Sequence, residues 1–98
     1  MAEMSSPTPE DAVGPLGSLP CYNQKHTVEK DATVTIHGGI FSVKDDVYTW
    51  QLRNSHGVSE VLGNTNGSEP WFIPDEIGDY LVTLPTTQGL ASFTFHVI

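Results

Sequence analysis

Acidic side chains are the first residues in this 98-residue sequence whose type and spacing could bind a metal ion. Asp45 and Asp46 are adjacent, and Glu29 and Asp31 would add ligands if their loop converged on the same point. A hard cation such as calcium takes about 6–8 oxygen ligands, several of them carboxylates. The pattern leaves two interpretations, a calcium site at Asp45 and Asp46 or a solvated acidic turn. No other cofactor is predicted.

The histidines are a second set of potential metal ligands. His26, His37, His56 and His96 lie far apart in the sequence, on different predicted strands or loops. A zinc site needs three or four such ligands held together in space. We therefore predict that the four imidazoles are solvated surface groups.

Adjacent aromatic residues could provide a platform for a sugar ring. Trp71 and Phe72 are neighbours in a predicted strand, so one points inward and the other outward. We expect Trp71 and Ile73 to face the core and Phe72 to be exposed, and Tyr22 is the one obvious further aromatic for a glycan site. Such a face needs two or three coplanar rings. A single exposed phenylalanine is the alternative interpretation.

Catalysis and several classes of partner are disfavoured by motifs and charge. No Gly-x-Ser-x-Gly, P-loop or His-Glu-x-x-His motif occurs, so we predict no catalytic residues and no enzyme. The net charge of −8 repels nucleic acid and anionic membrane surfaces. No apolar run reaches the ~18 residues of a membrane span, so no membrane insertion is expected. Cys21 is the only cysteine, which excludes an intramolecular disulfide.

The elements that must position these residues are strands. About seven apolar–polar alternating segments at 8–12-residue spacing, without a helical stretch, predict an all-β sandwich over residues 21–98. Residues 1–20 are rich in Pro, Ser and Gly and are predicted to be a disordered lead-in or linker. We expect Pro85 to end the pairing of its strand, because it has no N–H to donate.

The same alternation predicts both faces of the sandwich. The inward residues of the segments should form an apolar core. They are Val34, Ile36, Tyr48, Trp50, Leu52, Tyr80, Val82, Leu84, Phe93, Phe95 and Val97. The outward residues should share a flat, neutral and hydroxylated face. They are Thr49, Gln51, Arg53, Leu81, Thr83, Ser92, Thr94 and His96. This face would either contact a protein or glycan weakly or be a plain solvated sheet surface.

Two segments carry a family resemblance. They are Tyr-Thr-Trp-Gln-Leu at 48–52, followed by Asn54 and Gly57, and Gly-Asp-Tyr-Leu-Val-Thr-Leu at 78–84. With the short turn and final strand that follow, the chain resembles PKD (polycystic kidney disease) domains and their bacterial and phage immunoglobulin-like relatives over roughly residues 28–98. The turn after the tryptophan departs from the Phe-Gly-Asp-Gly-like turn of PKD domains, which leaves a generic immunoglobulin-like domain as the alternative.

The resemblance implies an immunoglobulin-like, two-sheet antiparallel β-sandwich of about seven strands. Val82 stands where antibody domains have a core cysteine, so apolar burial must replace the disulfide. The hydroxyl of Tyr80 is expected to bond back to the backbone upstream. Some PKD-like domains hold calcium with clustered carboxylates in the loop that here contains Asp45 and Asp46.

The resemblance also implies a role without catalysis. We expect a display module on an extracellular, cell or virion surface that acts as a spacer or a weak adhesion domain for a protein or glycan. A carbohydrate-binding accessory domain of a secreted hydrolase is the first alternative, and a structural subunit of a symmetric particle is the second. No charged-then-apolar leader opens this sequence. If the domain is exported, we expect either that its signal lies on a longer parent protein or that the domain leaves the cell as part of a particle.

Overall fold

The computed structural model describes residues 22–98, and these residues form an all-β fold. The prediction for residues 1–20, like that for Cys21, lies outside the described residues. The strands are β1 (Tyr22–Val28), β2 (Val34–Thr35), β3 (Gln51–Arg53), β4 (Ser59–Glu60), β5 (Trp71–Phe72), β6 (Gly78–Thr86) and β7 (Gly89–Val97). One 3₁₀ turn, η1 (Lys44–Asp46), interrupts the described strands. The predicted all-β class is confirmed.

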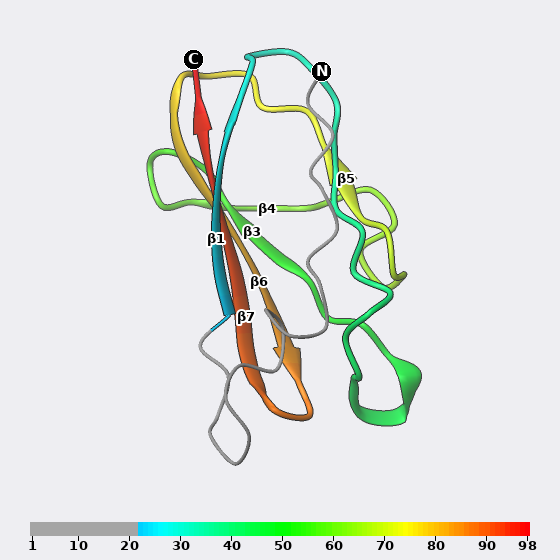
Figure 1. The fold of residues 1–98 in the computed structure, drawn as a ribbon. Helices are drawn as coiled ribbons and strands as arrows, with labels where there is room; N and C mark the ends of the chain where they lie inside the picture. Colours follow the sequence, from blue (N-terminus) through cyan, green and yellow to red (C-terminus); the bar gives the residue numbers. More distant parts are fainter. Residues whose placement is uncertain (1–21) are drawn as a thin grey trace.

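The strands form two sheets in a β-sandwich-like arrangement. A five-stranded sheet has the order β1-β7-β6-β3-β4, and a small sheet pairs β2 with β5. Figure 1 shows the long strands β1, β7 and β6 running together, with β5 lying apart from them. β1 is parallel to β7 while the other pairings are antiparallel, so the prediction of a wholly antiparallel sandwich is wrong at β1. A parallel pair cannot be connected by a tight hairpin. Accordingly, β1 pairs with a strand that lies almost seventy residues further along the chain.

The core lies between the two sheets. Every predicted core residue is buried except Tyr48, which is half-buried and packs against the others. β6 and β7 supply seven of the seventeen buried core residues, because their burial alternates residue by residue, as the pleat of a strand requires. Further buried residues close its sides and ends. They are Tyr22, Val28, Phe41, Val43, Leu62, Phe72 and Ala91.

Pro85 lies inside β6 and pairs with Leu90 of β7, so the predicted end of pairing at this residue is wrong. Proline removes one backbone donor, which disrupts a strand only where that donor is needed. On its other side β6 is paired with β3 only through Leu81, Val82 and Thr83. The missing N–H at Pro85 therefore removes no bond to β3, and β6 and β7 continue to a two-residue turn.

The side chains of β5 point opposite to the prediction. Phe72 is 4% exposed, whereas Trp71 is 44% exposed and Ile73 is also exposed. Phe72 stacks on Tyr80, with ring centroids 5.7 Å apart, and meets Phe95 edge-on at 5.4 Å. The flanking Pro70 and Pro74 are fully buried as well. An alternating strand that buries both prolines must also bury the residue midway between them, which is Phe72.

The hydroxyl of Tyr80 fixes the entry into β6. It donates to Oδ1 of Asp75, five residues upstream, at 3.1 Å. Burial of the ring, followed by the hydrogen bond to Asp75, raises the pKa of Tyr80 above the ordinary tyrosine value of 10.0. The sequence predicted a bond from this hydroxyl to the backbone upstream, whereas the hydroxyl donates to the Asp75 carboxylate. Backbone hydrogen bonds from Glu76 and Asp75 act in the opposite direction and lower the pKa of Tyr80 in part.

We expect this contact to make the free energy of unfolding decrease at alkaline pH. Because the folded-state pKa of Tyr80 is raised, its stabilising effect is complete below the unfolded value of 10.0 and is lost as pH rises above it. Tyr80→Phe should cost about 0.5–1.5 kcal/mol at neutral pH. The variant should also lose part of the decline in unfolding free energy above about pH 10. Urea unfolding of both proteins across this pH range measures the difference, and identical alkaline slopes would contradict the assignment.

Candidate functional site

The outward side chains of four neighbouring strands lie in three rows across the five-stranded sheet. Cross-strand pairing aligns positions of β3, β6, β7 and β1 with one another, and alternation points their side chains away from the core. The first row is Gln51, Thr83, Ser92 and Asn23. The second row is Arg53, Leu81, Thr94 and Lys25. The third row is Asp79, His96 and Thr27. We call these residues the outer face.

The outer face brings together most of the residues that the sequence proposed for an interaction surface. Gln51, Arg53, Thr83, Thr94 and His96 are all in its rows. Thr49 is exposed but precedes β3. It lines a separate shallow hollow of about 460 Å³ with Lys44, Asp45, Val47, Pro85 and Thr86.

The contribution of β1 to the outer face was missed from the sequence. Asn23, Lys25 and Thr27 extend the rows by one strand because β1 pairs in parallel with β7. Parallel partners far apart in sequence leave no local signal such as a hairpin turn. The alternation within residues 22–28 could have identified which side chains of this strand face outward, but not which strand lies beside it.

Most charged groups on the outer face are paired. Nδ1 of His96 lies 2.8 Å from Oδ1 of Asp79, and Nη1 of Arg53 donates to the carbonyl of Gly57 at 3.1 Å. The hydroxyl of Ser92 donates to Oδ1 of Asn23. Lys25 differs, because its ammonium has no ion-pair partner within residues 22–98. It is therefore available to donate to a ligand.

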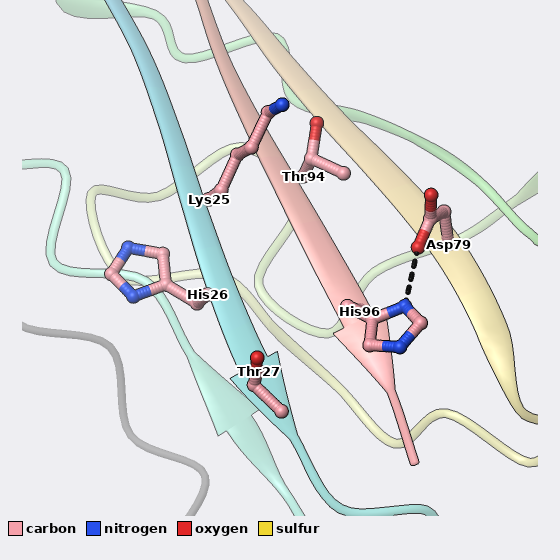
Figure 2. Close-up of a pocket in the computed structure, with 6 residues that line it drawn as sticks. All are labelled: Lys25, His26, Thr27, Asp79, Thr94 and His96. Atoms are coloured by element: carbon pink, nitrogen blue, oxygen red, sulfur yellow. Dashed lines mark hydrogen bonds and ion pairs between the residues drawn. The ribbon is translucent and has the colours of Figure 1, made fainter.

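A shallow hollow of about 310 Å³ lies over β1, β7 and β6 at this point. Figure 2 shows Lys25, Thr27, Thr94 and the His96–Asp79 pair on one side of the strands. The hollow offers an ammonium donor, two hydroxyls and an imidazole–carboxylate pair. Groups of this kind can hydrogen-bond a hydroxylated or amide-bearing partner. The hollow is too open to exclude water from a ligand.

His26 lines the edge of this hollow from the other side of β1 (Figure 2). Its ring stacks on Phe95 with centroids 5.7 Å apart, and its Nε2 lies 2.8 Å from Oε1 of Gln24. Partial burial lowers the pKa of His26 below its ordinary value of 6.5. The prediction of four solvated histidines is therefore wrong for His26, because its alternating position turns it inward.

The carboxylates considered for calcium do not converge. Figure 1 shows the turn after β1, which holds Asp31, and the η1 turn, which holds Asp45 and Asp46, at opposite ends of the fold. Asp31 instead forms an ion pair with Lys30 at 2.8 Å. Among residues 22–98, no group of three or more His, Cys, Asp or Glu side chains is placed to hold a metal ion. The expected completion of the site by the β1–β2 turn is therefore wrong.

The three aromatics considered for a glycan site do not share a surface. Phe72 is buried as described above, and Tyr22 is 4% exposed. The ring of Tyr22 packs edge-on against Phe41 and Phe93, at centroid distances of 5.3 and 5.5 Å. Trp71 alone is exposed, on the outward side of the small sheet. A coplanar row of these three rings is excluded by the inward direction of two of them.

Comparisons with known proteins leave the family open. The chain matches no protein-family model, and no curated protein matches it by sequence. Within the described residues there is also no helix of sufficient length and apolarity to span a bilayer.

Proposed function

We propose that this chain is a non-catalytic display module that makes weak polar contacts through its outer face. The contacts would be with protein or glycan on the surface of a cell or particle, and the module would be extracellular or part of a virion surface. The observation that carries the proposal is the alignment of hydroxyl, amide and charged side chains in three rows on an open sheet. Such a surface provides many hydrogen-bonding groups but no enclosed cavity, which suits low-affinity contact.

We further propose that the fold is immunoglobulin-like, of the PKD-like variety. The small sheet pairs β2 with β5, and the larger sheet has β3, β6 and β7 adjacent. These are the pairings of strands B with E and of C, F and G in immunoglobulin sandwiches. The contact of Tyr80 with Asp75 at the start of β6 resembles the tyrosine corner of that fold.

An amide-shift titration tests the outer face directly. Isotope-labelled protein is titrated with dextran, a soluble neutral polymer rich in hydroxyl groups. We expect fast-exchange shifts at the amides of Thr83, Thr94 and Lys25. Thr94→Val keeps the shape of the side chain but removes its hydroxyl, so binding should weaken about 2–10-fold if one hydrogen bond is lost.

Thr87→Val is the matched control, because Thr87 is exposed in the β6–β7 turn, away from the three rows. Its affinity for dextran should equal that of the unchanged protein. Shifts that avoid the outer face, or equal weakening in both variants, would contradict the proposal. Light scattering over a range of protein concentrations separates a monomeric module from the alternative of a particle subunit, whose mass should rise with concentration.

A further inference from the structure

We propose a second binding site on the opposite side of the molecule, in which the indole of Trp71 stacks on one ring of a neutral pyranose oligosaccharide. Trp71 belongs to β5 of the small sheet, and its neighbour Phe72 points into the core. Its indole therefore points away from the five-stranded sheet. The site does not depend on the outer face, which lies on the other side of the sandwich.

The indole ring is held flat against the backbone of Gly63. Trp71 and Gly63 exchange both backbone hydrogen bonds, at 2.8 and 3.0 Å. A Cβ atom on Gly63 would overlap three bonded ring atoms of Trp71, namely Cε2, Nε1 and Cζ2. The added Cβ would lie at a similar distance from all three atoms, so the ring presents its face, and not its edge, to Gly63. Its opposite face is thereby turned to solvent.

Polar groups lie on the same sheet face as this exposed ring, toward β2. The indole N–H of Trp71 has no acceptor within residues 22–98. Thr35 lies directly across from Trp71 on β2 and is only half-buried. Glu69 lies two residues before Trp71 on the same face, and its carboxylate is exposed. Oε2 of Glu69 lies 3.0 Å from Nδ1 of His37. One exposed ring is fewer than the two or three of an extended glycan platform, so this face suits weak stacking of a single sugar ring, with a few polar groups nearby.

The chemistry of the site selects a neutral ligand. The C–H-bearing face of a pyranose ring is apolar and complements the electron-rich face of an indole. The hydroxyls of the stacked ring would bond to the indole N–H, and those of the adjoining sugar ring to Thr35 and Glu69 on the β2 side. Acidic sugars are disfavoured, because Glu69 is itself anionic and the chain carries a net charge of −8. A single stacked ring should bind at roughly millimolar affinity.

The alternative occupant is a second copy of this chain. Ile73, on the same strand face as Trp71, is 50% exposed, and Val61, two residues before Gly63, is 86% exposed. These aliphatic residues would favour self-association through an apolar patch. Their presence makes a control variant necessary, because both occupants would perturb signals around Trp71.

The experiment is a titration of isotope-labelled protein with cellohexaose, xylohexaose and mannohexaose, up to tens of millimolar. The two indole N–H resonances are assigned through Trp71→Phe. We expect at least one sugar to shift the Trp71 resonance in a saturable way while the Trp50 resonance stays in place. Trp71→Ala, followed at the amides of Thr35 and Gly63, should weaken binding about tenfold or more, whereas Trp71→Phe should retain part of it.

Two further variants separate ring placement from general apolarity. Gly63→Ala keeps the indole but displaces it, so binding should fall although the amide spectrum stays dispersed. Val61→Ala removes an exposed apolar side chain but no ring, so binding should stay within about twofold.

No saturable shift at Trp71 with any of the three sugars overturns the proposal, as does equal weakening by Val61→Ala. Shifts that appear with protein concentration alone overturn it in favour of self-association. Sugar-induced shifts confined to Thr83 and Thr94 overturn this site but leave the outer-face proposal intact.

Discussion

Replacing Trp50 with alanine should lower the free energy of unfolding by about 3–5 kcal/mol. The indole is 4% exposed, and its Nε1 donates to the carbonyl of Gly67 at 2.7 Å. It stacks parallel to Tyr48 and lies 6.0 Å from the ring of Phe93. Alanine would leave a cavity in the core and an unpaired carbonyl at its edge. Urea unfolding measures the loss, which is a large part of the ~5–15 kcal/mol that stabilises a small domain.

Trp71→Ala is the matched control, because it removes the same ring from the surface. Trp71 makes no side-chain hydrogen bond in the described structure, so the loss should be about 1 kcal/mol, the usual size for a point mutation. If Trp50→Ala prevents folding, Trp50→Phe keeps an apolar ring and loses mainly the bond to Gly67. A loss below about 1 kcal/mol for Trp50→Ala would mean that Trp50 lies outside the core.

The long strands could be predicted from the sequence because their alternation is unbroken. In β6 and β7 each inward residue is apolar and its neighbours are polar or exposed, so the period alone fixes the face. The short β5 gave no such signal. Trp71, Phe72 and Ile73 are all apolar, and either phase buries a large side chain. Only the burial of the flanking Pro70 and Pro74, a tertiary property, selects Phe72 for the core.

The candidate sites also differ in how far the sequence alone predicts them. The outer-face residues of β3, β6 and β7 follow from alternation, but the neighbouring position of β1 depends on a long-range parallel pairing. The expected convergence of Asp31 with Asp45 failed because the sequence does not say at which end of the fold each turn lies. The stacking of Trp71 on Gly63 depends on a single bridge between β5 and an irregular segment. The glycine at position 63 is the only feature of the sequence that points to it.

The second large effect is expected for Phe93→Ala, which should also cost about 3–5 kcal/mol. Phe93 is fully buried, and its ring lies 5.5 Å from Tyr22, 6.1 Å from Phe41 and 6.0 Å from Trp50. β7 is paired along its length with β1 on one side and β6 on the other. A strand held on both sides has little freedom to move into a cavity, which places the loss toward the upper end of the range.

Thr94→Ala supplies the control for Phe93→Ala at the next residue of the same strand. Its side chain points to the outer face, so its effect on the unfolding free energy should stay within about 0.5 kcal/mol.

The double variant of Trp50 and Phe93 adds a test of contact. Because the two rings pack against each other, their losses should be non-additive by about 0.5–3 kcal/mol. Equal losses for Phe93→Ala and Thr94→Ala would show that β7 does not present alternate residues to two different faces, and both the core and the outer face would then be misassigned.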